Sequence, residues 1–108
     1  MKIVIKTTDA KALKAKILKE AKDGTLNTWS YKKGKDDEFI THSPEQWFDK
    51  VILEFIPSKN NDELEVKPGY WTGKDKPTNA DYGTILGRFA ERLWIQYRDD
   101  IISFNSLV

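Results

Sequence analysis

The segment Lys50–Pro57, which reads KVILEFIP, constrains the fold more than any other part of the chain. Alternate residues of a strand point to opposite faces of its sheet. Both faces of this segment are largely apolar, with Val51, Leu53 and Phe55 on one and Ile52 and Ile56 on the other. The pattern predicts a central strand with a neighbour on each side. Its second apolar face would need cover, and we expect a partner chain to supply it.

Hydrophobic periodicity and turn signals predict the elements around this strand. Before it they are a strand at 2–6, a helix Ala10–Lys22 capped by Asp9 and ended by Gly24, two strands within 25–42 around a turn at Lys33–Asp37, and a short helix starting at Ser43–Gln46. After it they are a strand at 63–67, a second long helix starting near Thr78–Asp81, and a strand within 99–105. On the second helix, apolar side chains recur every three or four residues, at Tyr82, Leu86, Phe89, Leu93 and Tyr97, and predict its buried stripe.

This order, β-α-β-β-β-β-α-β, predicts one α+β domain over residues 1–108. The sheet should be mainly antiparallel, with about five to six strands and both long helices on one face. Gly83 and Gly87 lie four residues apart on the second helix and lower its helix propensity. We therefore expect them to let that helix approach the sheet, or a twin helix, closely.

Charge is unevenly distributed along the chain. Residues 1–35 hold ten lysines and three acidic residues, a net +7, whereas residues 36–108 hold eight basic and fourteen acidic residues, a net −6. The lysines of the first helix surround its apolar stripe instead of forming one line, so we expect weak, nonspecific nucleic-acid binding at most. The chain has no cysteine, and its start has an apolar run of only three residues. A cytoplasmic location without a membrane anchor is therefore expected.

Few residues carry catalytic chemistry. His42 is the only histidine, and its neighbour Ser43 should point to the opposite face of a strand, so the two do not form a nucleophile–base pair. A surface or capping role is expected for His42. Arg88 and Arg92 share one helix face and could hold an anion. No metal or cofactor motif is present, so we expect neither a metal nor a cofactor.

Two adjacent aromatic residues, Tyr70 and Trp71, lie in a loop rich in glycine and proline. Such rings could stack on a base or a sugar. Since the surrounding half of the chain is acidic, we expect this loop mainly to cover the end of the core.

Two segments of the chain resemble a known group of proteins. They are THSPEQW at residues 41–47, preceded by Trp29 and Phe39, and GRFAERL at residues 87–93. The pattern resembles a group of small bacterial proteins of unknown function with a THTPEQW-like segment and a later GRF-E-L helix segment. That group often has a histidine before GRF, where this chain has Leu86. The resemblance implies no activity, but it implies that the two segments belong to one structural unit.

Three functions remain open from the sequence. The favoured one is a non-catalytic, self-associating interaction module, with a homodimer expected and a further protein partner left open. The alternative is a nucleic-acid-binding domain that uses the basic first helix with Trp29 or Tyr31, and the third is an enzyme built on carboxylates. The candidate ligand or partner contacts are Tyr70, Trp71, Arg88, Arg92, His42 and Trp47.

Overall fold

The computed structural model describes residues 1–107. Its elements are β1 (Lys2–Lys6), α1 (Ala10–Lys22), β2 (Trp29–Lys33), β3 (Glu38–His42), β4 (Ile52–Pro57), β5 (Glu63–Gly69), α2 (Asn79–Gln96), the single-turn 3₁₀ helix η1 (Arg98–Asp100) and β6 (Ser103–Leu107). The predicted α+β order is confirmed, and most predicted bounds hold to within a few residues.

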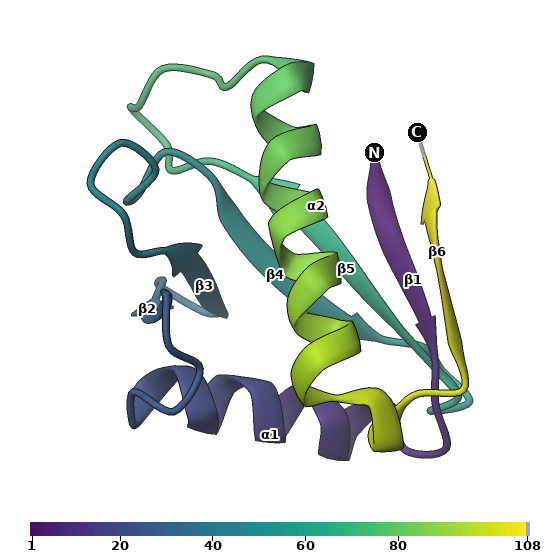
Figure 1. The fold of residues 1–108 in the computed structure, drawn as a ribbon. Coiled ribbons are helices and arrows are strands. Elements are labelled where there is room, and N and C mark those ends of the chain that lie inside the picture. Colours follow the sequence, from purple (N-terminus) through teal and green to yellow (C-terminus); the bar gives the residue numbers. More distant parts are fainter. Residues whose placement is uncertain (108) are drawn as a thin grey trace.

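The six strands form one sheet in the order β2-β3-β4-β5-β1-β6, and every neighbouring pair is antiparallel. The predicted central strand is β4, which lies between β3 and β5. Both long helices cover the same face, with α2 crossing in front of β4 and β5 and α1 running across one end (Figure 1). The sheet therefore has a helix-covered face and an open face, and its two edges are β2 and β6.

The core lies between the helices and the covered face. Leu53 and Phe55 of β4 are buried there, as are the stripes Leu13–Ile17–Ala21 of α1 and Leu86–Phe89–Leu93–Tyr97 of α2. Of the predicted α2 stripe, only Tyr82 is half-buried. Both helices begin as their sequences predict. The Asp9 carboxylate accepts from the Ala12 amide, and Thr78 forms a capping box with Asp81.

The predicted short helix after Ser43 is wrong. Residues 45–50 form consecutive turns, in which the amides of Trp47 and Phe48 both donate to the Pro44 carbonyl. The Ser43 hydroxyl does not cap a helix, because it forms a hydrogen bond of 2.8 Å with the Ser30 hydroxyl of the neighbouring strand. Asp49 then adopts a φ of 61°, which is incompatible with continuing a right-handed helix.

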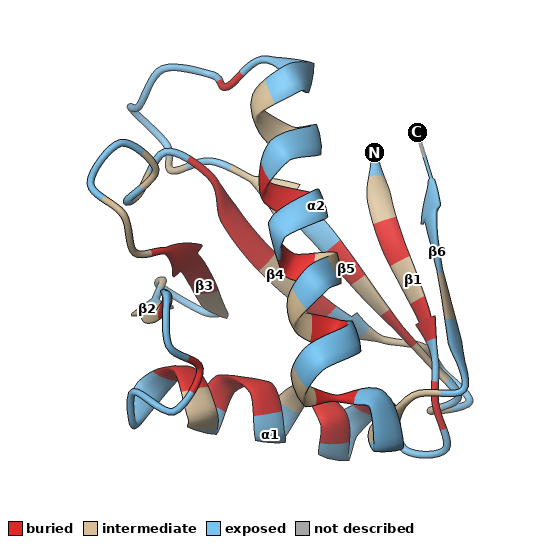
Figure 2. Cartoon of the chain, viewed as in Figure 1, coloured by how far each residue is buried: buried red, intermediate tan, exposed pale blue. Residues whose placement is uncertain are grey.

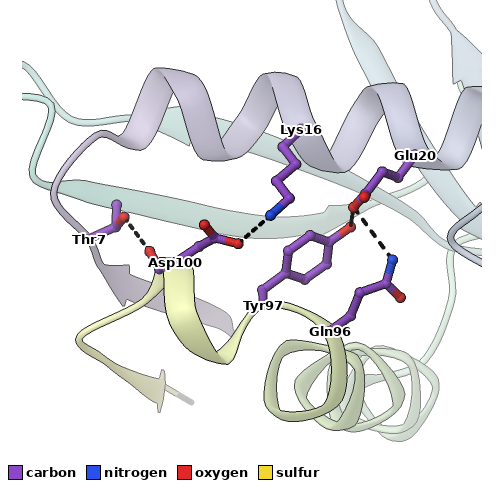
Figure 3. A network of polar contacts seen from close by, with 6 residues as sticks. All are labelled: Thr7, Lys16, Glu20, Gln96, Tyr97 and Asp100. Carbon is purple, nitrogen blue, oxygen red and sulfur yellow. Dashed lines mark hydrogen bonds and ion pairs between the residues drawn. The ribbon is translucent and has the colours of Figure 1, made fainter.

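A polar network joins the C-terminal end of α2 to α1 (Figure 3). The buried Tyr97 hydroxyl donates to the Glu20 carboxylate at 2.7 Å, and Gln96 donates to the same oxygen at 3.4 Å. Asp100 links η1 to the rest of the fold, because its carboxylate accepts from Lys16 and its carbonyl from the Thr7 hydroxyl. This network fixes the direction in which the chain leaves α2 toward β6.

Candidate functional site

A hollow on the open face of the sheet is the candidate site. Its floor comes from β3, β4 and β5, where Phe39 lies opposite Glu54, Glu54 opposite Lys67, and Ile52 opposite Gly69. These residues point away from the helices because their chain neighbours, such as Ile40 and Leu53, point into the core.

The loop after β5 forms one wall of this hollow. The Trp71 ring meets the Phe39 ring edge to face, with centroids 5.2 Å apart and planes at 78°. The Trp71 indole N–H donates to the Asp49 carboxylate at 3.0 Å, and the other oxygen of that carboxylate lies 3.2 Å from Lys32 Nζ. The indole is therefore held on both its ring and its polar atom.

The expectation that this loop mainly covers the end of the core is wrong for its aromatic residues. Trp71 packs on the open face, whereas Tyr70 borders the same hollow, is 40% exposed, and lies close enough to Tyr82 of α2 to add to the rise that burial causes in the pKa of that side chain. The cause is the register of β5, since Gly69 lies beside Ile52 and the chain continues from there across the open face.

The hollow has a volume of about 520 Å³ and a mixed lining. The apolar residues that border it are Phe39, Ile52, Pro68, Tyr70 and Trp71, and the charged ones are Lys35, Lys67, Asp36, Asp37 and Glu54. The border therefore has three acidic and two basic residues. The volume lies within the range of about 300–1,000 Å³ that is usual for ligand pockets.

His42 lies on the other face of the sheet and is not a surface residue, which corrects the expectation for it. Only 7% of its surface is exposed, its ring packs against Trp29 with centroids 4.6 Å apart, and its Nδ1 lies 3.0 Å from the Thr28 carbonyl oxygen. Burial lowers the pKa of His42, the hydrogen bond with Thr28 partly opposes this shift, and the positive charges of Arg88 and Arg92 on α2 add to it. The expected separation from Ser43 is confirmed, because the Ser43 hydroxyl bonds Ser30 instead.

The remaining candidate contacts do not join the hollow. Arg88 is exposed and Arg92 half-buried on the flank of α2 near His42. Trp47 packs against the core, with Lys50 Nζ 5.3 Å from its ring centroid. The structure therefore keeps Tyr70 beside Trp71 at the hollow and places His42 with the two arginines on the opposite side of the sheet. Trp47 belongs to neither group.

The stacking rings that the nucleic-acid alternative needs are largely occupied. Trp29 is 2% exposed and packs edge-on against Phe89. Tyr31 donates its hydroxyl proton to Glu38, and Lys22 Nζ lies 4.4 Å from the centroid of its ring. Trp29 cannot stack on a base without rearrangement of the core, and a base on Tyr31 would have to displace Lys22 from its ring.

Sequence reasoning missed the contribution of Phe39, Asp49 and Glu54 to the hollow. The alternation of strand residues could have identified two of them. Phe39 and Glu54 point to the face opposite to that of their chain neighbours Ile40 and Leu53. Asp49 could not be found this way, since its contact with Trp71 joins two loops 22 residues apart.

A second feature lies at the β6 edge of the sheet. Within residues 1–107, β6 pairs with β1 alone, and four of its five residues are exposed (Figure 2). Apolar side chains gather around it: Ile102 is 69% exposed, Leu107 is 44% exposed, and Trp94 of α2 is 62% exposed with its ring 5.4 Å from that of Phe104. This edge is the most apolar exposed border of the sheet.

Gly83 and Gly87 lie on the exposed side of α2. A Cβ atom added at Gly87 would meet nothing within 4 Å, and one added at Gly83 would meet only the Met1 sulfur, at 3.8 Å. The expectation that these glycines bring α2 close to the sheet is therefore wrong, whereas the approach of a twin helix remains a prediction.

Within residues 1–107, no three histidine, aspartate or glutamate side chains are grouped so that they could hold a metal ion. In the same part of the chain, no helix combines the length and apolar composition needed to cross a bilayer. Comparison with protein-family models, with curated protein sequences and with solved structures finds no match to this chain.

Proposed function

We propose that this protein is a non-catalytic interaction module that self-associates through the outer edge of β6. The observation that supports this proposal most strongly is the composition of that edge strand. The strand reads SFNSL and holds no charged residue and no proline, the two features that commonly block pairing at an edge. Its backbone groups on the outer side have no strand partner within the described residues.

Antiparallel pairing of two β6 strands is the arrangement that closes this edge. It requires a two-fold axis perpendicular to the sheet, so that the same surface of each copy meets the other. Two six-stranded sheets would then join into one continuous sheet, with the helices of both copies on the same face. The pairing stops at two copies, because the edge is used up once it forms.

Exposed apolar groups next to the edge support the proposal. Ile102 and Leu107 lie at the two ends of β6, and Trp94 lies beside Phe104 on the helix-covered side. Burying apolar surface contributes roughly 25 cal/mol per Å². In a dimer, Ile102, Leu107 and Trp94 of both copies would be buried at the two ends of the paired strands.

The proposed interface is not the second face of β4, where the sequence predicted that a partner chain would supply cover. Ile52 on that face is 5% exposed in the single chain, so the chain itself supplies the cover that a partner was expected to give. Ile56 is 39% exposed, but both residues next to it on this face are charged: Glu65 lies opposite it on β5, and Glu54 lies two residues earlier on β4. The apolar border at β6 is the stronger candidate.

The test is the mass of the protein in solution, measured by light scattering during size-exclusion chromatography. At micromolar concentration we expect twice the chain mass of 12.5 kDa. The double variant Ser103→Lys, Asn105→Lys places like charges on both paired strands and should give the monomer mass, while its circular dichroism stays unchanged.

The matched control is Thr28→Lys, Gln46→Lys, which adds the same charge at exposed positions just before β2, the opposite edge strand, and in the turn after β3. This control should remain dimeric. A wild-type protein of monomer mass, or equal dissociation of both double variants, would contradict the proposal.

A further inference from the structure

The hollow on the open face combines aromatic rings with an excess of negative charge. The rings of Phe39 and Trp71 meet there, and three acidic and two basic residues border it. Ring faces attract cations because their π-electrons carry partial negative charge. Rings and carboxylates together favour a positively charged group and disfavour a phosphate.

Glu54 lies at the centre of the floor, on β4 between Phe39 of β3 and Lys67 of β5. It is half-buried, and in the described part of the chain its carboxylate forms no ion pair and no side-chain hydrogen bond. Lys67 is its direct cross-strand neighbour but is exposed and does not pair with it. This carboxylate is therefore available to a ligand.

The rings are held in place before any ligand arrives. Asp49 holds the Trp71 indole, which in turn packs edge to face on Phe39. The Phe39 ring rests on Gly34, where an added Cβ atom would lie only 2.7 Å from its Cε2. Such preorganisation lowers the entropic cost of ordering these side chains when a ligand binds.

We propose that this hollow binds the cationic side chain of an arginine or lysine presented by a peptide. The ammonium or guanidinium group lies against the rings and pairs with Glu54. The aliphatic stem of the side chain packs on Ile52, in the manner in which such stems cover apolar surface. A volume of about 520 Å³ leaves room for the residues that flank the cation. This site is separate from the β6 edge and does not depend on self-association.

The test follows the Trp71 indole N–H in ¹H–¹⁵N spectra during titration with acetyl-Gly-Arg-Gly-amide. The neutral comparison is the same peptide with citrulline, which has the shape of arginine without its charge. We expect a saturable shift of the Trp71 signal, with the citrulline peptide binding about tenfold more weakly. The indole of Trp94, which lies at the β6 border, should not move and serves as an internal reference.

A pair of variants separates the site from general charge. Glu54→Gln keeps the side-chain shape, and we expect it to weaken the arginine peptide about tenfold while leaving the citrulline peptide unchanged. Glu65→Gln removes the same charge from the neighbouring strand outside the hollow and should leave both affinities unchanged.

Three results would overturn the proposal, and the first two need no variant. They are equal affinity for the arginine and citrulline peptides, stronger binding of uridine monophosphate than of the arginine peptide at Trp71, and the same loss of binding in Glu54→Gln and Glu65→Gln. The second result would favour a nucleic-acid ligand instead.

Discussion

The two edges of the sheet differ in how they are protected. At the β2 edge, Lys32 and Lys33 carry positive charge, and Trp29 is buried between His42 and Phe89. At the β6 edge no residue is charged, and the strand is exposed along nearly its whole length (Figure 2). Charge and tight packing are common means of preventing pairing at an edge. This difference in charge and exposure is the basis on which self-association through β6 was proposed.

Each edge is joined to α2 by one aromatic pair, and these pairs differ in the same way. Trp29 and Phe89 meet with centroids 5.4 Å apart, and both are almost fully buried. Trp94 and Phe104 meet at the same centroid distance, but Trp94 is 62% exposed. The first pair belongs to the core, and the second has one side open to solvent.

The largest expected effect breaks the buried pair. Phe89→Ala should lower the free energy of unfolding by about 3–5 kcal/mol, because it leaves a cavity among fully buried side chains. Trp94→Ala, on the exposed side of the same helix, should change it by about 0.5 kcal/mol or less in the monomer. Urea unfolding at low protein concentration measures both, and similar losses in the two variants would contradict the assignment of the two pairs.

A smaller effect concerns the network that directs the chain toward β6. Tyr97→Phe removes the hydrogen bond to Glu20 and should cost about 1.5–3 kcal/mol, the range for a hydrogen bond to a charged group. The pKa of Tyr97 is raised by its burial and by Glu20, so the hydroxyl remains a donor at neutral pH. Tyr82→Phe is the control, since that half-buried hydroxyl has no hydrogen-bond partner within residues 1–107. Equal losses in the two variants would count against the network.

Much of the fold follows from local signals. The bounds of α1 are predicted well because Asp9 caps it, its apolar residues recur every four positions, and Gly24 follows it with a φ of 84°. The turn after Ser43 was not predictable in this way. The bond between Ser43 and Ser30 joins two strands and exists only once the sheet has formed.

The candidate site was predictable only in part. Tyr70 and Trp71 stand out in the sequence as a ring pair in a loop, but the face on which they pack depends on the register of β5 against β4. The contact between Trp71 and Phe39 likewise requires three strands to be in register. Such contacts depend on pairing between distant strands, which no local pattern encodes.

The smallest expected effect is a pH dependence at the β2 edge. Burial and the nearby arginines lower the pKa of His42, so the unfolded chain takes up a proton at this residue before the folded chain does. Stability should therefore fall as the pH decreases from about 7 to about 5, below the ordinary histidine pKa. In His42→Gln this component should vanish, so the difference in unfolding free energy between the two proteins should change across that interval. Parallel profiles would show that His42 does not contribute.

Amide hydrogen exchange at two protein concentrations tests the self-association of β6 most directly. Self-association through β6 should slow exchange of amides in Ser103–Leu107 as the concentration rises, because pairing covers the outer side of the strand. Amides of Trp29–Lys33 should exchange at the same rate at both concentrations. Exchange in β6 that does not depend on concentration, or equal slowing at both edges, would contradict the claim that β6 is the edge through which this protein associates.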